Sequence, residues 1–173
     1  MNLTDAVSLI YAREIDAVNK SAWADLGCGD GLFSNAIASL LAPDSIVFAV
    51  DIKPVMPGLA TEKPVRISTV KKDFASDELQ LPLLDGIIMA NSLHFVSSQD
   101  KCIKRLAEFL KPNGVFIIVE YDLSMPNRWV PYPLPAATLP SLFRPAGFAN
   151  VREINRLPSV YQRADIYGCI ICR

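Results

Sequence analysis

An aspartate and three closely spaced glycines form the densest group of residues suited to ligand chemistry. They lie in WADLGCGDGLF, residues 23–33, where Asp25 closes a short apolar run and Gly27, Gly29 and Gly31 follow at every second position. Glycines let the backbone turn sharply and let a ligand pack directly against the main chain. The pattern predicts a ligand-binding loop between a strand and a helix.

The spacing of this loop departs from that of dinucleotide-binding folds. Those folds need glycine or alanine at the position of Leu32. The carboxylate of Asp25 would also repel a pyrophosphate, because it brings one negative charge close to another. A cationic ligand suits the loop better, and an NAD-dependent oxidoreductase is kept as a second alternative function.

Polar side chains also close the next three predicted strands. Asp51 stands where a carboxylate can accept both hydroxyls of a ribose. Asp73 can accept a hydrogen bond from an adenine amino group while Phe74 and Ile52 pack on the ring. Asn91 closes the fourth strand. Taken singly, each carboxylate could instead be a turn or helix cap, but ligands of open α/β sheets gather at the carboxyl ends of strands. We therefore expect one shared crevice.

The elements that must position these residues alternate along the chain, as is typical of a βαβ protein with a buried, mostly parallel sheet. We expect helices over residues 3–18, 32–41, 99–110 and 139–143, and strands over residues 21–26, 46–52, 65–74, 84–90, 115–121, 151–157 and 166–173. The short link between the last two strands predicts an antiparallel hairpin. Prolines within residues 53–63 disfavour a long crossover helix there.

These motifs, in this order, resemble those of the class I S-adenosylmethionine-dependent methyltransferases, of the type 11 and 12 kind. DLGCGDG is similar to the first motif of that family, AVDI to the second, KKDF to the third, and MANSLHFV with LAEFLKPNGVFIIVEY to the fourth strand, next helix and fifth strand. The resemblance covers residues 21–173. It implies one Rossmann-like α/β domain over residues 1–173, with a seven-stranded, mostly parallel sheet, an antiparallel last strand and helices on both faces.

The resemblance also implies S-adenosylmethionine as cofactor and S-adenosylhomocysteine as product. The residues implied for cofactor binding are Asp25, Gly27, Cys28, Gly29, Asp51, Ile52, Asp73, Phe74 and Asn91. Gly27 and Gly29, with Asp25 nearby, would hold the methionine portion, and the backbone of Asn91 would lie beside the sulfonium and the amino group. The positive sulfonium and ammonium groups of this cofactor would explain a carboxylate at Asp25, whereas a pyrophosphate would not.

Methyl transfer from a sulfonium has a neutral leaving group, so the main task is to align nucleophile, methyl and sulfur in a dry pocket. His94, the only histidine, follows the fourth strand and is the candidate general base. Its alternative role is packing between Leu93 and Phe95. Within the family, the absence of a [DN]PP[YF] motif after Asn91 disfavours amino methylation of DNA bases or protein glutamine.

The methyl acceptor is not identified by the sequence. We expect it to contact the N-terminal helix within residues 1–20 and the proline-rich loop at residues 124–145. The candidate contacts are Tyr11, Tyr121, Arg128, Trp129 and Tyr132, although the loop could instead only cover the edge of the sheet. The short segment before the first strand suits a macromolecular acceptor or a partner protein that completes the pocket, and a small molecule is also open. A catalytically silent cofactor-binding protein of the same fold is the other alternative, which the intact glycine loop disfavours.

Composition excludes several other classes. With 51% hydrophobic and 20% charged residues among 173, the chain is not intrinsically disordered. Its net charge of −1 disfavours a cationic nucleic-acid surface, although residues 124–173 carry an excess of basic side chains that could meet an anionic substrate or form a solvated face. No apolar run approaches the length of about 18 residues that a membrane span needs. We expect a cytoplasmic protein.

The four cysteines do not predict metal or disulfide chemistry. Cys169 and Cys172 fall in a predicted strand, where residues three apart point to opposite faces. A zinc site is disfavoured because the chain has one histidine and no second CxxC motif. No metal is expected.

Overall fold

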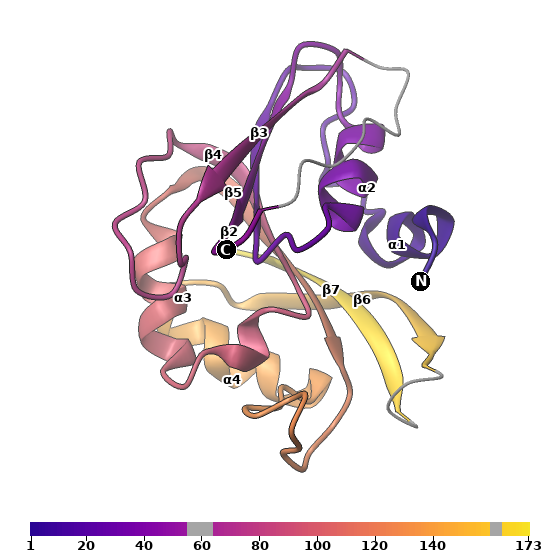
Figure 1. Ribbon diagram of the computed structural model, residues 1–173, viewed down its shortest axis with the longest axis vertical. Helices are drawn as coiled ribbons and strands as arrows, with labels where there is room; N and C mark the ends of the chain where they lie inside the picture. Colours follow the sequence, from indigo (N-terminus) through magenta and orange to yellow (C-terminus); the bar gives the residue numbers. More distant parts are fainter. Residues whose placement is uncertain (55–63, 160–163) are drawn as a thin grey trace.

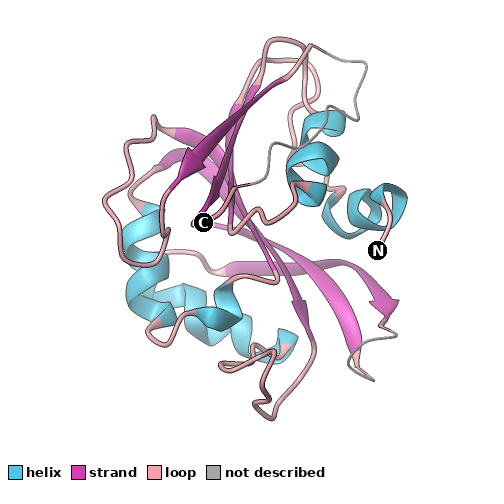
Figure 2. Cartoon of the chain, in the orientation of Figure 1, coloured by secondary structure: helices cyan, strands magenta, loops and turns pink. Residues whose placement is uncertain are grey.

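One mixed sheet organises the protein, whose computed structural model describes residues 1–54, 64–159 and 164–173. Its strands are β1 (Ala22–Leu26), β2 (Ile46–Asp51), β3 (Arg66–Lys71), β4 (Leu84–Ala90), β5 (Leu110–Tyr121), β6 (Asn150–Pro158) and β7 (Asp165–Cys172). They lie in the order β3-β2-β1-β4-β5-β7-β6. Figure 2 shows the strands between helices on either side. The first five pair in parallel, and β7 is antiparallel to both β5 and β6. The predicted seven-stranded sheet and its closing hairpin are confirmed.

Helices cover both faces of the sheet, as predicted. Helices α1 (Leu3–Ile10) and α2 (Leu32–Leu40) pack on one face, and α3 (Gln99–Ala107) and α4 (Leu139–Phe143) on the other (Figure 1). Three short 3-10 helices complete the structure, namely η1 (Leu93–Phe95), η2 (Ala136–Thr138) and η3 (Arg144–Ala146). Among the described residues, no helix is both long and apolar enough to cross a bilayer.

The central strands are apolar at successive positions because their side chains enter two separate cores, one on each face of the sheet. Along β5, Phe116 and Ile118 belong to the cluster under α3 and α4, whereas Ile117 and Val119 belong to the cluster under α1 and α2. Successive side chains of a strand point to opposite faces, so a strand buried on both faces must be apolar throughout. Such a sheet meets solvent mainly at its edges, and a ligand site is expected there.

The first helix is shorter than its apolar periodicity predicts. It ends at Ile10 because Tyr11 adopts an extended conformation, with φ of −66° and ψ of 109°. Ile15 is still buried, but Val18 is 85% exposed beside a turn in which Asp16 accepts the backbone N–H of Val18. The prediction of a helix to residue 18 is therefore wrong: an irregular segment buries Ala12 and Ile15 and leaves Val18 exposed.

The third predicted helix ends three residues earlier than expected, and the fifth predicted strand begins five residues earlier. Helix α3 ends at Ala107, and Leu110 already pairs with Leu84 of β4. The register then shifts before Gly86 pairs with Val115, so the intervening residues form an irregularity within β5. Pairing with β4 thus overrides the helical pattern near residue 110.

Two further predictions concern residues 53–63 and the two cysteines of β7. Residues 53–63, where a long crossover helix is disfavoured, lie outside the described residues from position 55 onward. In β7, Cys169 belongs to the cluster under α3 and α4, whereas Cys172 packs against the opposite cluster. The two thiols lie on opposite faces of the sheet, as predicted.

Candidate functional site

The glycine loop between β1 and α2 is packed against two other strand ends. The backbone N–H groups of Gly27 and Cys28 both donate to the carbonyl of Val50 in β2, at 2.8 and 3.1 Å. Gly27 has a φ of +78°, and a Cβ added there would lie 2.4 Å from the Cβ of Ser92, just after β4. Glycine is therefore required at this position both for backbone conformation and for close packing.

Asp51, at the end of β2, fixes the outer part of the same loop. One carboxylate oxygen accepts the N–H of Gly29 at 3.0 Å, and the other accepts the N–H of Lys53 at 2.8 Å. A carboxylate has about four acceptor positions, so Asp51 keeps capacity for two hydroxyl donors. The next residue, Ile52, is 58% exposed. Both side chains are available to a ligand, as predicted from the sequence.

The segment after β3 is a turn capped by its own carboxylates. Asp73 accepts the N–H of Ala75 and the hydroxyl of Ser76, both at 2.8 Å, while Asp77 accepts the N–H of Asp73 at 2.9 Å. Strand β3 consequently ends at Lys71, and the predicted extension of that strand to residue 74 is wrong. Asn and Asp favour such turns because their side chains bond to the backbone nearby.

A single arginine of α3 holds this turn in place. The guanidinium of Arg105 donates to the carbonyls of Phe74 and Asp77, the latter at 2.8 Å. The ring of Phe74 is thereby fixed against the core with one edge uncovered. Sequence reasoning missed Arg105, because its bonds join residues about thirty positions apart.

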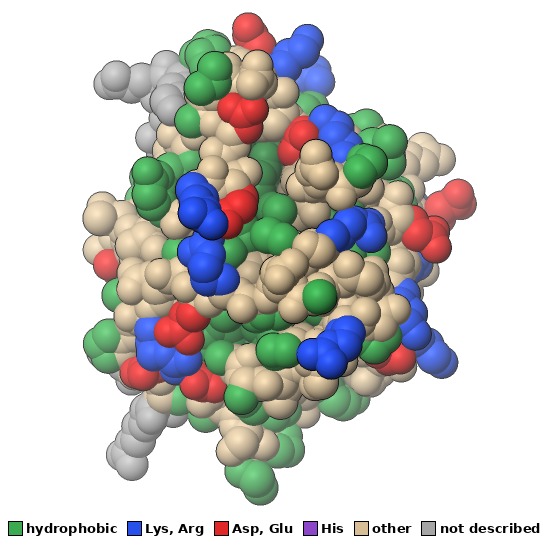
Figure 3. Space-filling view, turned by 180° about the vertical axis from the view of Figure 1, so that it is seen from behind, with side chains coloured by type: hydrophobic (Ala, Val, Ile, Leu, Met, Phe, Trp, Pro, Cys, Tyr) green, Lys and Arg blue, Asp and Glu red, His purple; other side chains and the backbone are tan. Residues whose placement is uncertain are grey.

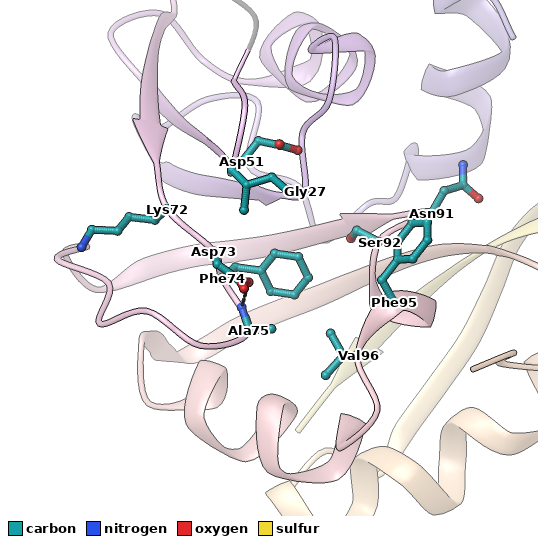
Figure 4. Close-up of a pocket in the computed structure, with 11 residues that line it drawn as sticks. Gly27, Asp51, Lys72, Asp73, Phe74, Ala75, Asn91, Ser92, Phe95 and Val96 are labelled. Atoms are coloured by element: carbon teal, nitrogen blue, oxygen red, sulfur yellow. Dashed lines mark hydrogen bonds between the residues drawn. The ribbon is translucent and has the colours of Figure 1, made fainter. Parts of the chain in front are cut away.

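The predicted strand ends converge on one space, which we call the Phe74 cavity. It has a volume of about 440 Å³. Six predicted residues line it, namely Gly27, Asp51, Ile52, Asp73, Phe74 and Asn91. In Figure 4 the rings of Phe74 and Phe95 both face this space, while Lys72, which also lines it, has its ammonium end directed away from the other labelled residues. The cavity therefore offers aromatic walls and carboxylates.

Residues in and beside η1 also line the Phe74 cavity and were not predicted. They are Phe95 of η1 and the flanking residues Ser92 and Val96. Phe95 is 61% exposed, which is unusual for a phenylalanine beside a buried strand. An aromatic residue directly after a polar strand end is the sequence signal that could have revealed it.

A second space, the Asp25 cavity, lies under the glycine loop. It has a volume of about 260 Å³ and is lined by residues that include Asp25, Gly27, Cys28, Gly29 and Asn91. Asp25 is almost fully buried, and burial raises the pKa of its carboxyl to about 7. One oxygen accepts the hydroxyl of Ser34 at 2.6 Å, and the other has no partner among the described residues. A buried acceptor without a donor fits a cationic or hydrogen-bonding ligand.

A third space, the Asp5 cavity, lies beyond Asn91 and under α1. It has a volume of about 330 Å³ and is lined by Asp5, Phe33, Asn91 and Tyr121 among others. Asn91 has a φ of +51°, lines all three cavities, and carries a buried side-chain oxygen with no partner among the described residues. The three cavities therefore adjoin one another at the residue that closes β4.

Comparison with known protein families decides what this arrangement belongs to. The family model described as a methyltransferase domain matches residues 24–114, a little over half of the chain. The chain belongs to this methyltransferase family. It is an S-adenosylmethionine-dependent methyltransferase domain, and S-adenosylmethionine is its cofactor.

Solved structures agree with this methyltransferase in fold. The Burkholderia thailandensis 1,6-didemethyltoxoflavin-N1-methyltransferase, solved with 1,6-didemethyltoxoflavin and S-adenosylhomocysteine, is 19% identical with a TM-score of 0.71, and the match covers 99% of this chain and 77% of that one. A SAM dependent methyltransferase from Aquifex aeolicus is 16% identical with a TM-score of 0.65, and the match covers both chains fully. The [4+2]-cyclase SpnF is 17% identical, with a TM-score of 0.67 over 99% of this chain and 80% of that one. No curated protein sequence matches.

The residues of the methyltransferase crevice suit this cofactor chemically. A bulky side chain cannot replace Gly27, and the unpartnered oxygen of Asp25 lies where an ammonium group would satisfy it. Burial raises the pKa of the Cys28 thiol to about 12, so this cysteine is a neutral wall of the site and not a nucleophile. The binding roles assigned to individual residues stay predictions that this geometry suits.

His94 of the methyltransferase lies in a buried pair. Its ring Nδ1 is 2.5 Å from Oε2 of Glu120, and its backbone N–H donates to Oε1 of the same side chain at 3.2 Å. Burial raises the pKa of Glu120. The ring lines none of the three cavities and lies 4.3 Å from that of Phe95. A role as general base stays a prediction. A glutamate in the apolar run FIIVEY is the sequence signal for a buried partner of the only histidine.

The proposed acceptor contacts of the methyltransferase divide into two groups. Tyr121 lines the Asp5 cavity, whereas Tyr11 is 67% exposed and lines none of the three cavities. In the proline-rich loop, the guanidinium of Arg128 lies 5.5 Å from the ring centroid of Trp129, and the N–H of Tyr132 donates to the carbonyl of His94. The loop is therefore attached to η1 at the carboxyl edge of the sheet, but its contact with an acceptor stays a prediction.

Proposed function

We propose that this methyltransferase binds S-adenosylmethionine along the carboxyl edge of its sheet and transfers the methyl group to a small acceptor in the Asp5 cavity. The adenosine portion would lie in the Phe74 cavity, between aromatic rings and beside Asp51. The methionine portion would lie in the Asp25 cavity, and the methyl group would face the space beyond Asn91.

The observation that carries this proposal is the sign of the charges along the first two cavities. Asp25, Asp51 and Asp73 line them; Lys72 also lines the Phe74 cavity, but its ammonium end points away from the other labelled residues (Figure 4). A pyrophosphate would meet three carboxylates there and one lysine that is directed away from them. A ligand with a ribose and two positive groups is favoured at the same positions.

The residues of the chain would contribute alignment more than acid–base chemistry. S-adenosylmethionine supplies an electrophilic methyl group when bound, and its leaving group is neutral. The glycine loop and Asp51 would fix the cofactor, while Phe33 and Tyr121 would exclude water from the acceptor side. These residues would therefore promote methyl transfer by positioning the cofactor and the acceptor.

A small acceptor is favoured by the dimensions and surroundings of the Asp5 cavity. Its volume of about 330 Å³ is in the range of small-molecule sites. On the described part of the face seen in Figure 3, lysine and arginine side chains are scattered and several lie next to acidic ones. That pattern differs from the continuous positive surface that nucleic-acid binding needs. A partner protein that completes the site stays a prediction.

Calorimetry tests the cofactor assignment directly. The protein should bind S-adenosylmethionine and S-adenosylhomocysteine and should bind NAD far more weakly. Asp51→Ala should weaken S-adenosylhomocysteine binding by about a hundredfold, because two charge-assisted hydrogen bonds are lost. Asp51→Asn should lose less, because it keeps one acceptor oxygen.

Asp16→Asn is the matched control for these variants. Asp16 also caps a backbone turn, but it lies on another cavity, beside Ser21 and Trp23. Its substitution should leave cofactor affinity unchanged. Preferential binding of NAD, or wild-type affinity in Asp51→Ala, would overturn the proposal.

A further inference from the structure

We propose that the Asp5 cavity selects an uncharged or cationic acceptor that carries an N–H or O–H donor, and that Asp5 is the residue that sets this specificity. The inference rests on the proposed function, because it assigns the chemical class of the acceptor at the same site. It commits to a compact, mostly apolar molecule without a carboxylate or phosphate.

The capping geometry of α1 directs the carboxylate of Asp5. The side chain of Asn2 accepts the N–H of Asp5 at 2.8 Å, and Oδ2 of Asp5 accepts the N–H of Asn2 at 3.3 Å. This reciprocal capping box holds one oxygen of Asp5. The other oxygen has no hydrogen-bond partner among the described residues, and the side chain is half-buried on the cavity wall.

The remaining wall of the cavity is mostly apolar. Leu32 and Phe33 come from α2, Leu157 from β6 and Ile166 from β7. Among the described lining residues, Asp5 has the only charged side chain, and the α-amino group of Met1 is the other charged group of a lining residue. An apolar surrounding strengthens a charge–charge or charge–donor interaction, since the local dielectric is lower than that of water. One carboxylate can therefore discriminate between acceptors by charge.

The neighbouring Asp25 cavity adds a further carboxylate. Asp30 lines it, whereas the carboxylate of Asp25 would be paired with the ammonium group of the cofactor. An anionic acceptor would be brought close to Asp30 as well as to Asp5. Like charges at such distances disfavour binding, whereas a cation or neutral donor is accommodated.

Two described arginines near the C-terminus are paired with acidic side chains. Arg152 pairs with Glu14, and Arg156 pairs with Asp122, at 2.7 and 2.6 Å. Neither arginine lines the Asp5 cavity. At these two positions the positive charge of residues 124–173 is directed into ion pairs, and this favours a solvated face over a site for an anionic substrate.

The test uses three probes of matched shape and different charge, namely phenethylamine, phenethyl alcohol and phenylacetate. Each is titrated into protein saturated with S-adenosylhomocysteine, and binding is followed by ¹⁵N NMR shifts of Asp5, Leu32 and Tyr121. The amine should bind about tenfold more tightly than phenylacetate, and the alcohol should fall between them. In Asp5→Asn the advantage of the amine should disappear, while the capping acceptor is kept.

Asp100→Asn is the matched control, because Asp100 occupies the first turn of α3 on the opposite face of the sheet. It should preserve the order of the three probes. Equal binding of amine and phenylacetate, an unchanged order in Asp5→Asn, or the same loss in Asp100→Asn would each overturn the inference. Calorimetry with S-adenosylhomocysteine alone separates the two proposals: absence of cofactor binding would overturn the proposed function and this inference with it, whereas lost charge selectivity in protein that binds the cofactor overturns this inference alone.

Discussion

The two sides of the crevice are built in different ways. On the β1–β2–β3 side, turns follow directly after strands, and the bond that joins Gly29 to Asp51 spans 22 residues. On the β5–β7–β6 side, α1 is held by pairs such as Ser8 with Asn155, which are 147 residues apart. The cofactor side is thus built from turns that directly follow strands and bond to one another, whereas the acceptor side depends on packing between the two ends of the chain. Substitutions on the first side should change cofactor affinity, and those on the second should not.

Gly27→Ala should have the largest effect. The new Cβ would lie 2.4 Å from Ser92 and within 3.3 Å of the ring of Phe74, and the residue would keep a positive φ. Ser92 cannot yield easily, because its hydroxyl donates to the carbonyl of Leu26 in the core. Overpacking and left-handed backbone together should lower the free energy of unfolding by about 3 kcal/mol and abolish S-adenosylhomocysteine binding in calorimetry.

Gly29→Ala is the matched control for this substitution. Gly29 also has a positive φ, of 53°, but a Cβ there meets no atom within 4 Å. Only backbone strain should be added, so the free energy of unfolding should fall by about 1 kcal/mol in chemical denaturation. If the two variants were equally stable, close packing at Gly27 would not be what requires glycine.

The pH dependence of cofactor affinity should report Asp25. The free protein has a raised pKa of about 7 at this carboxyl because of burial, and pairing with an ammonium group favours the charged form. Affinity for S-adenosylhomocysteine should therefore rise by roughly tenfold between pH 6 and pH 8. Calorimetry across this range should show a much flatter profile for Asp25→Asn. A wild-type profile without a rise would contradict the role of Asp25.

Stability should change with pH in the opposite sense. The pKa of Asp25 in the folded protein lies above its ordinary value of 3.8, so its contribution to stability is fully present below that pH and is lost as pH rises through 7. At pH 8 the buried carboxylate should cost up to about 4 kcal/mol. Asp25→Asn should therefore be more stable than wild type at pH 8 in urea denaturation, although it binds the cofactor less tightly.

The same contrast explains which features the sequence could predict. Asp51 was predictable because its strand, its carboxylate and the glycine loop are all local patterns. The helical periodicity through Ile15 failed to place the end of α1, because burial of an apolar residue does not require a helix. Arg105 and Glu120 were missed because their partners lie in other elements, at 31 and 26 residues. Turns are specified by residues that are neighbours in the sequence, whereas tertiary contacts join residues that are far apart.

Arg105→Met tests a long-range contact on the cofactor side, and its effect on S-adenosylhomocysteine affinity should be smaller than that of Asp25→Asn. Loss of the bonds to the carbonyls of Phe74 and Asp77 would free the turn that carries the Phe74 ring. S-adenosylhomocysteine affinity should fall about fivefold, since a hydrogen bond from a charged donor contributes about 1 kcal/mol or more. Lys104→Met, at an exposed position one residue earlier in α3, is the control. Equal affinities in the two variants would show that Arg105 does not position Phe74.

Arg156→Met tests the acceptor side of the crevice and should have the smallest effect of these substitutions. Arg156 pairs with Asp122 after β5 and with Glu153 in β6, and these carboxylates raise its pKa further above its ordinary value. The pairs are partly exposed, so their loss should lower the free energy of unfolding by only about 1 kcal/mol in urea denaturation. Affinity for S-adenosylhomocysteine should stay within twofold of wild type, because no bond of Arg156 reaches the glycine loop or Asp51. A larger fall in affinity would mean that the two sides of the crevice are coupled, and that packing of β6 on β7 also shapes the cofactor site.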